Sequence, residues 1–285
     1  FRFGTDAQRE EYLPDLLAGR ALAGFGLTEP EAGSDAGATR TTARLDGGEW
    51  VIDGAKQFIT NSGTPITRFV TVTAVTGEPG SATREISTII VPSGTPGFTV
   101  GPAYDKVGWH ASDTHPLVFT GARVPEGNLL GERGRGFANF LHILDEGRIA
   151  IAALATGAAE GCLEAAVDYA KSRVVFGESL GSRQAIQFML ARMQQRVHVS
   201  RLAWLHAARL RDAGLPFKTE AAIAKLTSSD AAMDNARDAT QIFGGNGFMN
   251  EYPVARHFRD SKILEVGEGT TEVQLLLIAR SLGLA

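Results

Sequence analysis

Glu268 has the residue type and the setting that a proton acceptor needs. It stands between Gly267 and Gly269, directly ahead of a predicted helix that begins near Thr271. A glutamate on so uncrowded a backbone can project into a cavity, where loss of solvent would raise its pKa from about 4.3 towards the operating pH. The carboxylate would then be able to take a proton from carbon. The alternative interpretation is an ordinary turn in contact with solvent.

Two glycine-rich stretches could hold a ligand. Residues 26–37 (GLTEPEAGSDAG) would let the backbone approach a flat or anionic group closely, and the hydroxyls of Thr28 and Ser34 can donate hydrogen bonds to it. Residues 241–248 (QIFGGNGF) end a predicted helix at a glycine pair. Each stretch also has a purely structural interpretation, the first as a loop between a helix and a sheet and the second as a helix C-cap.

Several common signatures of catalysis are missing from the sequence. It contains no G-x-G-x-x-G after a strand, no G-x-x-x-x-G-K-[ST], no H-E-x-x-H and no G-x-S-x-G. Nicotinamide, P-loop, zinc-protease and serine-hydrolase functions therefore lose their best support. No metal site is expected, because no His or Cys lies at ligand spacing beside Cys162.

Composition narrows the setting and the partners. A net charge of -4 and a pI of about 5.9 give no basic surface for nucleic acid. No run approaches the roughly 20 apolar residues of a membrane span, so we expect a soluble protein with no membrane partner. The single Cys162 cannot form an internal disulfide, which suits a reducing compartment. We expect the cytoplasm of a bacterium, or the mitochondrial matrix if the source is eukaryotic.

The elements that must position these residues fall into two kinds. Residues 21–128 are rich in Thr, Val, Ile and Gly, and short alternating runs predict strands at 49–54, 68–73, 85–91 and 117–119. No helical period separates these runs, so an antiparallel barrel or sandwich is favoured over a Rossmann sheet.

After Gly136 the hydrophobic period becomes helical. Helices are predicted at about 137–174, from about 186 to 211, at 218–243 and at 271–281, and Gly214-Leu215-Pro216 ends the second of them. Residues 5–19 resemble the last helix of a further helical domain. The predicted domains are therefore a remnant of that domain at 1–20, a β domain at 21–128 and a helical domain at 129–285.

Taken together, these stretches resemble the acyl-CoA dehydrogenase family over nearly the whole chain. The L-T-E-P-x-A-G-S-D loop and the Q-I-F-G-G-N-G-F segment, with Glu251, Arg256 and Asp260 after it, match position by position. Residues 54–61 resemble the family's flavin-edge strand, 173–177 its R-x-x-F-G turn, and 145–148 the D-x-G-R of short-chain members. The resemblance implies an α+β multidomain fold, in which a middle antiparallel β-barrel precedes a C-terminal four-helix bundle. The family's N-terminal helical domain would be largely missing.

The resemblance also implies an activity. Glu268 would remove the α-proton of an acyl-CoA while a β-hydride passes to FAD, giving a trans-2-enoyl-CoA in fatty-acid or branched-chain amino acid breakdown. An electron-transferring flavoprotein would take the electrons, and the chain would form a homotetramer or homodimer. Gly267 replaces the Tyr common before the base, which favours short or branched acyl groups. Open alternatives are an acyl-CoA oxidase or other flavin enzyme on the same fold, and an inactive truncated homologue.

Site residues follow from the resemblance by position. The flavin ring and its surroundings would be lined by Phe25, Leu27, Thr28, Gly33, Ser34, Phe58, Ile59 and Thr60, with Thr270 and Glu272 completing that site. The ADP half would be held by Arg173, Phe176, Gln184, Gln241, Gly244 and Gly245, several of them supplied by a neighbouring subunit. The thioester and its pantetheine arm would contact Ser34, Asp145, Arg148 and Gly269. Gly147 stands where some members carry their catalytic Glu, which leaves Glu268 as the base.

Overall fold

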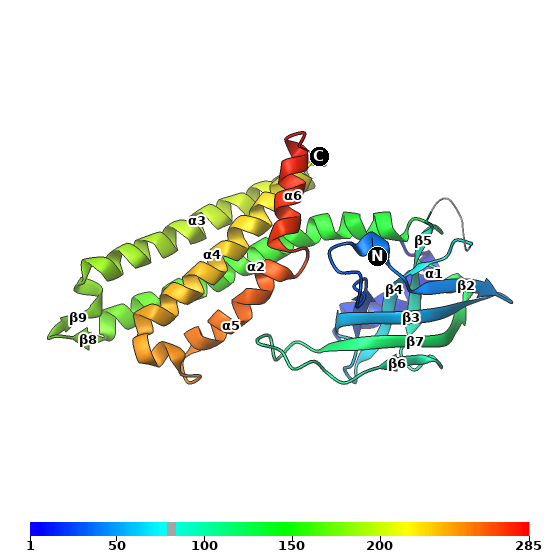
Figure 1. Ribbon diagram of the computed structural model, residues 1–285, viewed down its shortest axis with the longest axis horizontal. Coiled ribbons are helices and arrows are strands. Elements are labelled where there is room, and N and C mark those ends of the chain that lie inside the picture. The colour runs from blue at the N-terminus through cyan, green and yellow to red at the C-terminus, as the bar shows by residue number, and fades with distance from the viewer. Residues whose placement is uncertain (79–83, 285) are drawn as a thin grey trace. The chain divides into compact units, whose positions relative to one another are not determined.

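The computed structural model describes residues 1–78 and 84–284. They form two compact units, which are described separately (Figure 1). The first unit comprises residues 1–106 and 110–142, and the second comprises residues 107–109 and 143–285.

The first unit opens with the helix that the sequence predicts near residues 5–19. Helix α1 spans Asp6–Leu17, and Thr5 caps it: the Thr5 hydroxyl accepts from the Gln8 backbone N–H while the Gln8 side chain accepts from the Thr5 N–H. This reciprocal capping box satisfies two helix donors that would otherwise have no partner. The predicted helix is therefore confirmed, with its start fixed by local chemistry.

A curled sheet makes up most of the first unit. Its seven strands are β1(Leu22–Gly26), β2(Thr42–Asp46), β3(Glu49–Thr60), β4(Thr67–Val75), β5(Ile86–Pro92), β6(Phe98–Val100) and β7(Thr114–Pro125), with short 3-10 turns at Ala36–Ala38 and Glu126–Asn128. The order is β1-β4-β2-β3-β7-β6, and β5 also pairs with β4. Gly47 and Gly48 close the β2–β3 hairpin with φ of 63° and 83°, a conformation that glycine adopts without a steric cost.

Most strand pairs are antiparallel, as the sequence predicts, but two are not. Strand β1 runs parallel to β4, and β2 meets β4 in parallel at Thr42 and Val75. Parallel neighbours need a long crossover, and the segment between β1 and β4 supplies it. That crossover carries the glycine-rich stretch at residues 26–37, so the stretch is placed at the edge of the sheet.

Alternation along the strands builds the core of the first unit. Trp50 and Ile52 of β3 pack with Leu117 and Phe119 of β7, and all four side chains are buried. Side chains two apart on a strand point to the same face. Lys56 continues the inward row of Trp50 and Ile52, so a charged residue enters the core.

The second unit is helical. Its helices are α2(Gly136–Ser172), of which residues 136–142 belong to the first unit, α3(Gln184–Asp212), α4(Lys218–Phe243), α5(Pro253–Val266) and α6(Thr271–Ser281). They are joined by a small hairpin of β8(Val174–Val175) and β9(Glu178–Ser179) and by 3-10 turns at Leu180–Ser182 and Gly244–Phe248. The predicted helices correspond to α2, α3, α4 and α6. Helix α5 was not predicted, although Pro253 at its first turn is a typical helix start.

Small residues let the helices of the second unit approach closely. The main core cluster contains Ala159 of α2, Met193 of α3, Ala236 of α4 and Val254 of α5, all fully buried. The four helices of this core are thus α2, α3, α4 and α5. The short α6, which was predicted as one of the bundle helices, packs against α4 instead of joining this core.

Helix α2 differs from the expectation that no segment of the chain is apolar enough to span a membrane. Within the described residues it is long and apolar enough to cross a membrane by composition, with a mean hydropathy of 1.4 over its most apolar window. In that window 44% is buried inside the structure, and the core helix of a folded domain passes the same test.

Candidate active site

Glu268 lies on the link between α5 and α6 in an uncommon backbone conformation. Its φ is +55°, in the left-handed region, which costs a residue with a side chain about 1–3 kcal/mol. Phe58 and Phe176 share this feature, with φ of 60° and 52°. In the described part of the chain only Asn61 and Trp109 join them among non-glycine residues. Three of the five outliers are therefore predicted site residues.

The Glu268 carboxylate lies against α2. A β-carbon placed on Gly147 would come within 2.8 Å of Oε2 of Glu268, so the glycine leaves the space that the carboxylate uses. Burial raises the pKa of Glu268 above its ordinary value, and the positive charges of Arg148 and Lys225 oppose that rise. The result is a half-buried carboxylate that binds a proton more readily than a surface glutamate does.

Gly147→Ala is expected to lower turnover, because its methyl group would push the carboxylate from this position. A displacement of about 1 Å can cost on the order of 10²-fold in rate. Steady-state assays should show a fall in kcat with little change in the melting temperature. Gly157→Ala on the same helix, where a β-carbon meets nothing within 4 Å, is the matched control. A parental kcat in Gly147→Ala would show that the contact is irrelevant to the reaction.

Two predicted substrate residues, Asp145 and Arg148, lie on α2 close to Glu268. Arg148 is buried, with 4% of its surface exposed, and forms an ion pair with Asp145 one turn earlier. The Nε of Arg148 is buried and has no hydrogen-bond partner among the residues that the structure describes. A buried donor without a partner is costly, and an oxygen of a bound molecule would satisfy it. The structure therefore brings Asp145, Arg148 and Glu268 into one neighbourhood.

Lys225 of α4 and Gln274 of α6 also lie beside the turn at Glu268 and Gly269, and neither was predicted from the sequence. Each donates a 2.8 Å hydrogen bond to the carbonyl of Gly269, which is the third predicted substrate residue in this unit and lies on the turn after Glu268. Both side chains are fully buried. A signal existed for Lys225: it shares helical spacing with Ala221, Ser228 and Ala232 and so lies on the buried face of α4.

Thr270 and Glu272 have clear structural roles at the start of α6. The Thr270 hydroxyl accepts from the backbone N–H of Val273 at 3.4 Å and caps the helix. Hydrogen bonds from its own backbone and from Thr270 lower the pKa of the exposed Glu272. An anion in the first helical turn suits the helix dipole. These contacts account for both residues without a ligand and leave their predicted cofactor roles as predictions.

The predicted flavin residues of the first unit are gathered by two close contacts. The N–H of Gln57 donates to the carbonyl of Thr28 at 2.9 Å, which joins the loop after β1 to the end of β3. A β-carbon on Gly24 would lie 2.8 Å from the carbonyl oxygen of Thr60, so β1 also approaches β3 closely there. As a result the structure brings together Phe25, Leu27, Thr28, Phe58, Ile59 and Thr60.

Exposure differs within this group. The rings of Phe25 and Phe58 are 45% and 58% exposed, whereas Leu27 and Ile59 are buried. Gly33 and Ser34 lie on the exposed part of the loop at residues 26–37. Phe25 and Phe58 thus offer aromatic surface, while Leu27 and Ile59 support the strands below.

A buried ion pair anchors the loop at residues 26–37. The Lys56 ammonium lies 2.7 Å from Oε1 of Glu29 and also donates to the hydroxyls of Thr39 and Thr73, each at 3.0 Å. Glu29 accepts further from Thr39 and from the backbone N–H groups of Arg40 and Thr41. Burial opposes ionisation of Glu29, but these hydrogen bonds and the Lys56 charge lower its pKa to about 2. Glu29 and Lys56 lie in two of the matched sequence stretches, but neither was predicted as a site residue.

The predicted ADP residues gather at one end of the helical unit. Tyr169 near the end of α2 stacks on Phe243 at the end of α4, with ring centroids 4.0 Å apart, and accepts from the Asn246 amide at 3.0 Å. These contacts tie the segment after α2 to the glycine pair after α4. Arg173, Phe176, Gln184, Gln241, Gly244 and Gly245 are all exposed there.

The helical unit does not bring its two groups of predicted residues together. Helix α5 starts near the glycine pair and runs back along α4 for 14 residues, about 21 Å at 1.5 Å per residue (Figure 1). Glu268, Thr270 and Glu272 follow its far end. The ADP residues and the glutamate therefore lie at different places on the same bundle.

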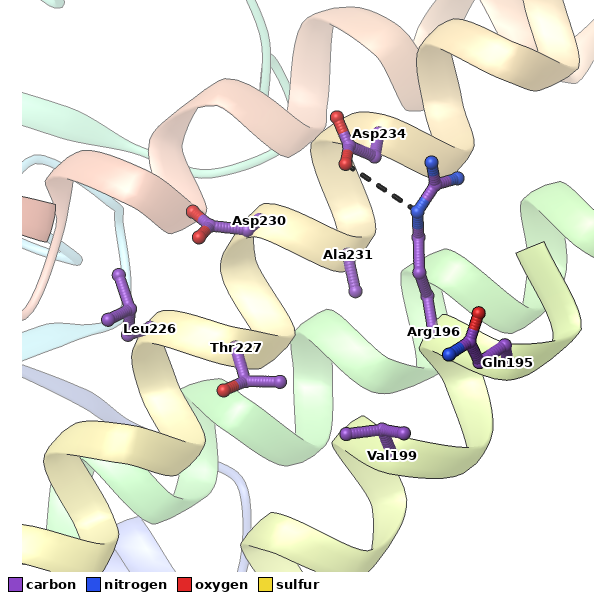
Figure 2. A pocket seen from close by; sticks show the side chains of 8 residues that line it. All are labelled: Gln195, Arg196, Val199, Leu226, Thr227, Asp230, Ala231 and Asp234. Carbon is purple, nitrogen blue, oxygen red and sulfur yellow. Dashed lines mark ion pairs between the residues drawn. The ribbon is translucent and has the colours of Figure 1, made fainter. Parts of the chain in front are cut away.

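An open pocket on the helical unit contains none of the predicted site residues. It measures about 370 Å³ and lies between α3 and α4 (Figure 2). Asp230 and Asp234 line it from α4, and Arg196 of α3 reaches Asp234 at 3.5 Å. Two of its charged residues, Arg196 and Asp234, are thus paired with each other, and we place no chemistry in the pocket.

Family models match both units. Residues 24–122 match the acyl-CoA dehydrogenase middle domain, and residues 134–283 match the acyl-CoA dehydrogenase C-terminal domain. The chain is 49% identical over 282 residues to a probable acyl-CoA dehydrogenase of Bacillus subtilis (strain 168), which covers 99% of this chain and 74% of that protein.

Solved structures give the same result. Butyryl-CoA dehydrogenase from Megasphaera elsdenii matches with a TM-score of 0.94 and 45% identity, over 99% of this chain and 73% of that one. A structure described as the electron transferring flavoprotein of Acidaminococcus fermentans matches with a TM-score of 0.94 and 43% identity, over 99% and 73%. A glutaryl-CoA dehydrogenase from Mycobacterium smegmatis in complex with FADH2 matches with a TM-score of 0.92 and 35% identity, over 99% and 70%.

The curled sheet, the helical unit and these matches define an oxidoreductase that acts on the CH–CH group of acyl-CoA thioesters. The chain belongs to the acyl-CoA dehydrogenase family, as its motifs predicted. The predicted fold class is confirmed with it.

Proposed function

We propose that the chain catalyses FAD-dependent α,β-dehydrogenation of a short or branched acyl-CoA to a trans-2-enoyl-CoA, with Glu268 as the base. The single observation that carries the proposal is the setting of Glu268. Its carboxylate is half-buried against Gly147, its pKa is raised, and its backbone is held in an unfavourable conformation. Raised carboxyl pKa values and local strain concentrate at catalytic sites.

The residues predicted to hold FAD fit such a group. Phe58 and Phe176 expose 58% and 98% of their surface while each holds an unfavourable left-handed backbone. Phe58 also contacts the ring of Tyr104, with centroids 5.2 Å apart. Gly33, Gly244 and Gly245 leave open space at their α-carbons, where a ligand could approach the backbone. The Arg173 guanidinium is exposed and suits a pyrophosphate. When bound, FAD would supply the acceptor for the β-hydride.

Proton removal is the step that this chain's own residues would perform. An ionised Glu268 Oε would accept the α-proton as the α-carbon gains negative character. Among the described residues, the backbone N–H of Glu268 donates to no protein acceptor, so it is available to the thioester carbonyl. The orphan Nε of Arg148 would donate to an oxygen of the substrate. Arg148 and Lys225 would keep a fraction of Glu268 ionised despite its burial.

Substrate length is proposed from the turn itself. Gly267 has no side chain and precedes the base, so it leaves volume beside the reacting carbons. The relative of known structure from Megasphaera elsdenii is named for butyryl-CoA, a four-carbon thioester. Short or branched acyl groups are the proposed substrates.

An electron-transferring flavoprotein is the proposed electron acceptor, supported by the likeness to the Acidaminococcus fermentans structure described under that name. The separation of the ADP residues from Glu268 within one helical unit supports a homodimer or homotetramer, in which a neighbouring chain supplies part of each cofactor site.

Anaerobic mixing of the flavin-loaded protein with a panel of thioesters tests this function. Butyryl-, isobutyryl- and isovaleryl-CoA are expected to bleach the flavin absorbance faster than palmitoyl-CoA does. Turnover should be faster with an electron-transferring flavoprotein than with oxygen alone. Bleaching by palmitoyl-CoA alone would overturn the chain-length proposal, and equal turnover with oxygen would indicate an oxidase. No bleaching by any thioester would refute the function.

A further inference from the structure

Lys225 is an unusual group to find inside a helical core. Its side chain is fully buried on α4, and in the described structure the Gly269 carbonyl, at 2.8 Å, is the only hydrogen-bond acceptor of its ammonium. The free energy lost when an ammonium group is desolvated exceeds the gain from one hydrogen bond to a neutral acceptor. The burial of Lys225 is therefore poor evidence that it stabilises the fold. A function that depends on the position and charge of Lys225 explains its presence better.

Gln274 of α6 binds the same carbonyl as Lys225 of α4. Its Nε2 donates to Gly269 at 2.8 Å and lies 3.5 Å from the carbonyl oxygen of Glu268. A β-carbon on Gly269, whose φ is +92°, would come within 2.7 Å of this Nε2. The close contact is therefore open only to glycine, and two helices hold the turn through one oxygen atom.

We propose that Lys225 and Gln274 are positioning residues for the reaction: by fixing the Gly269 carbonyl they hold Glu268 in its left-handed conformation with its carboxylate against Gly147. This inference rests on the proposed role of Glu268 as the base. Neither side chain touches the reacting atoms in this scheme. Both act through the backbone of the turn.

The charges around Lys225 make it an electrostatic partner of Glu268 as well. It faces Arg148 from α2, Asp230 from its own helix, Glu265 from α5 and Glu268 from the turn. Burial lowers the pKa of Lys225 to about 8, so the ammonium form persists at neutral pH. Helices α2 and α4 are in contact beside it, where Ile149 and Ala152 pack with Ala221 and Ala224. Removal of its charge would raise the pKa of Glu268 further.

The test uses the flavin-loaded protein with Lys225→Met, Gln274→Met, the double variant, and Lys218→Met as a control on the exposed start of α4. With butyryl-CoA, Lys225→Met is expected to lower kcat on the order of 10²-fold while KM stays within about threefold. The acid limb of its kcat profile should move to higher pH. The double variant should lose less than the product of the single losses, because both residues act on one carbonyl. Lys218→Met should match the parent.

Hydrogen exchange of the peptide at residues 267–274 gives a readout that does not depend on turnover. Exchange there should quicken about tenfold in Lys225→Met and in Gln274→Met, while the rest of the bundle keeps its protection. Parental kcat and parental exchange in both variants would overturn the inference. If Lys225→Met does not fold, Gln274→Met alone decides the matter by the same two measurements.

Glu268→Gln separates this inference from the proposed function. If that variant turns over like the parent, the base is wrong and the function fails, whereas the exchange experiment still reports whether the two residues hold the turn. If Glu268→Gln is inactive while Lys225→Met and Gln274→Met keep the parental kcat, the function stands and the positioning role is wrong.

Discussion

Glu268→Gln is expected to lower the rate of acyl-CoA dehydrogenation at least about 10³-fold, the largest loss of any single change proposed for this chain. Glutamine keeps the size of the side chain and fits the space beside Gly147, but it cannot accept a proton. The rate of anaerobic flavin bleaching in a single turnover measures the effect directly. Glu164→Gln, on the exposed face of α2, is the matched control and should bleach at the parental rate.

The pH dependence of the same rate follows from the raised pKa of Glu268. Glu268 works as a base only when ionised, so the parental rate should increase with pH and level off above a pKa that lies higher than the ordinary value of 4.5. The residual rate of Glu268→Gln should lack this limb. A parental profile that is already flat at pH 5, or a variant that keeps the limb, would contradict the assignment.

Lys56→Met is expected to destabilise the first unit by about 3–5 kcal/mol, the largest stability effect proposed here. The change leaves the Glu29 carboxylate buried and without its cation, 2.7 Å from where the ammonium stood. Urea unfolding measures the loss. Glu29→Gln added to Lys56→Met should recover part of it, because the double change removes both charges. Recovery of nothing would show that the two residues are not coupled.

Acid titration gives a second test of the same pair. The pKa of Glu29 in the folded protein is lowered to about 2 from an ordinary value of 4.5. Ionised Glu29 therefore contributes its full stabilisation above about pH 4.5, and that contribution is lost as the pH falls towards 2. Lys56→Met should show a weaker loss of stability across this window than the parent. Equal slopes in the two proteins would mean that the pair does not set the pKa of Glu29.

Local patterns predicted the helices and strands well, and strand partners poorly. Alternation identified β3, β4, β5 and part of β7, and the caps at Thr5 and Gly214 follow from local chemistry. The parallel pairing of β1 with β4 joins residues far apart in the sequence, and no local period encodes it. No element was predicted over the 14 residues of helix α5, which follow a glycine-rich turn and open on Pro253.

The candidate site shows the same division. Motifs located the predicted residues one by one, and the structure gathered Asp145, Arg148 and Glu268 while leaving the ADP residues elsewhere on the bundle. Of the buried cations, Lys56 lies in a matched stretch without a predicted role, and Lys225 lies in none. In the sequence, each lysine is recognisable only as a charged residue on an otherwise apolar face. Its role follows from its partner in the structure, which is Glu29 for Lys56 and the Gly269 carbonyl for Lys225.

The turn that carries Glu268 is a short link between two capped helices. Gly267 donates to the Ile263 carbonyl at 2.7 Å as the C-cap of α5, and Thr270 is the N-cap of α6, so only Glu268 and Gly269 lie between the two caps. Because the two helices restrict its backbone, Glu268 loses little conformational entropy when its carboxylate is positioned against a bound substrate. The same shortness leaves no length of loop to absorb a shift, so movement of α6 along its own axis would carry the carboxylate with it.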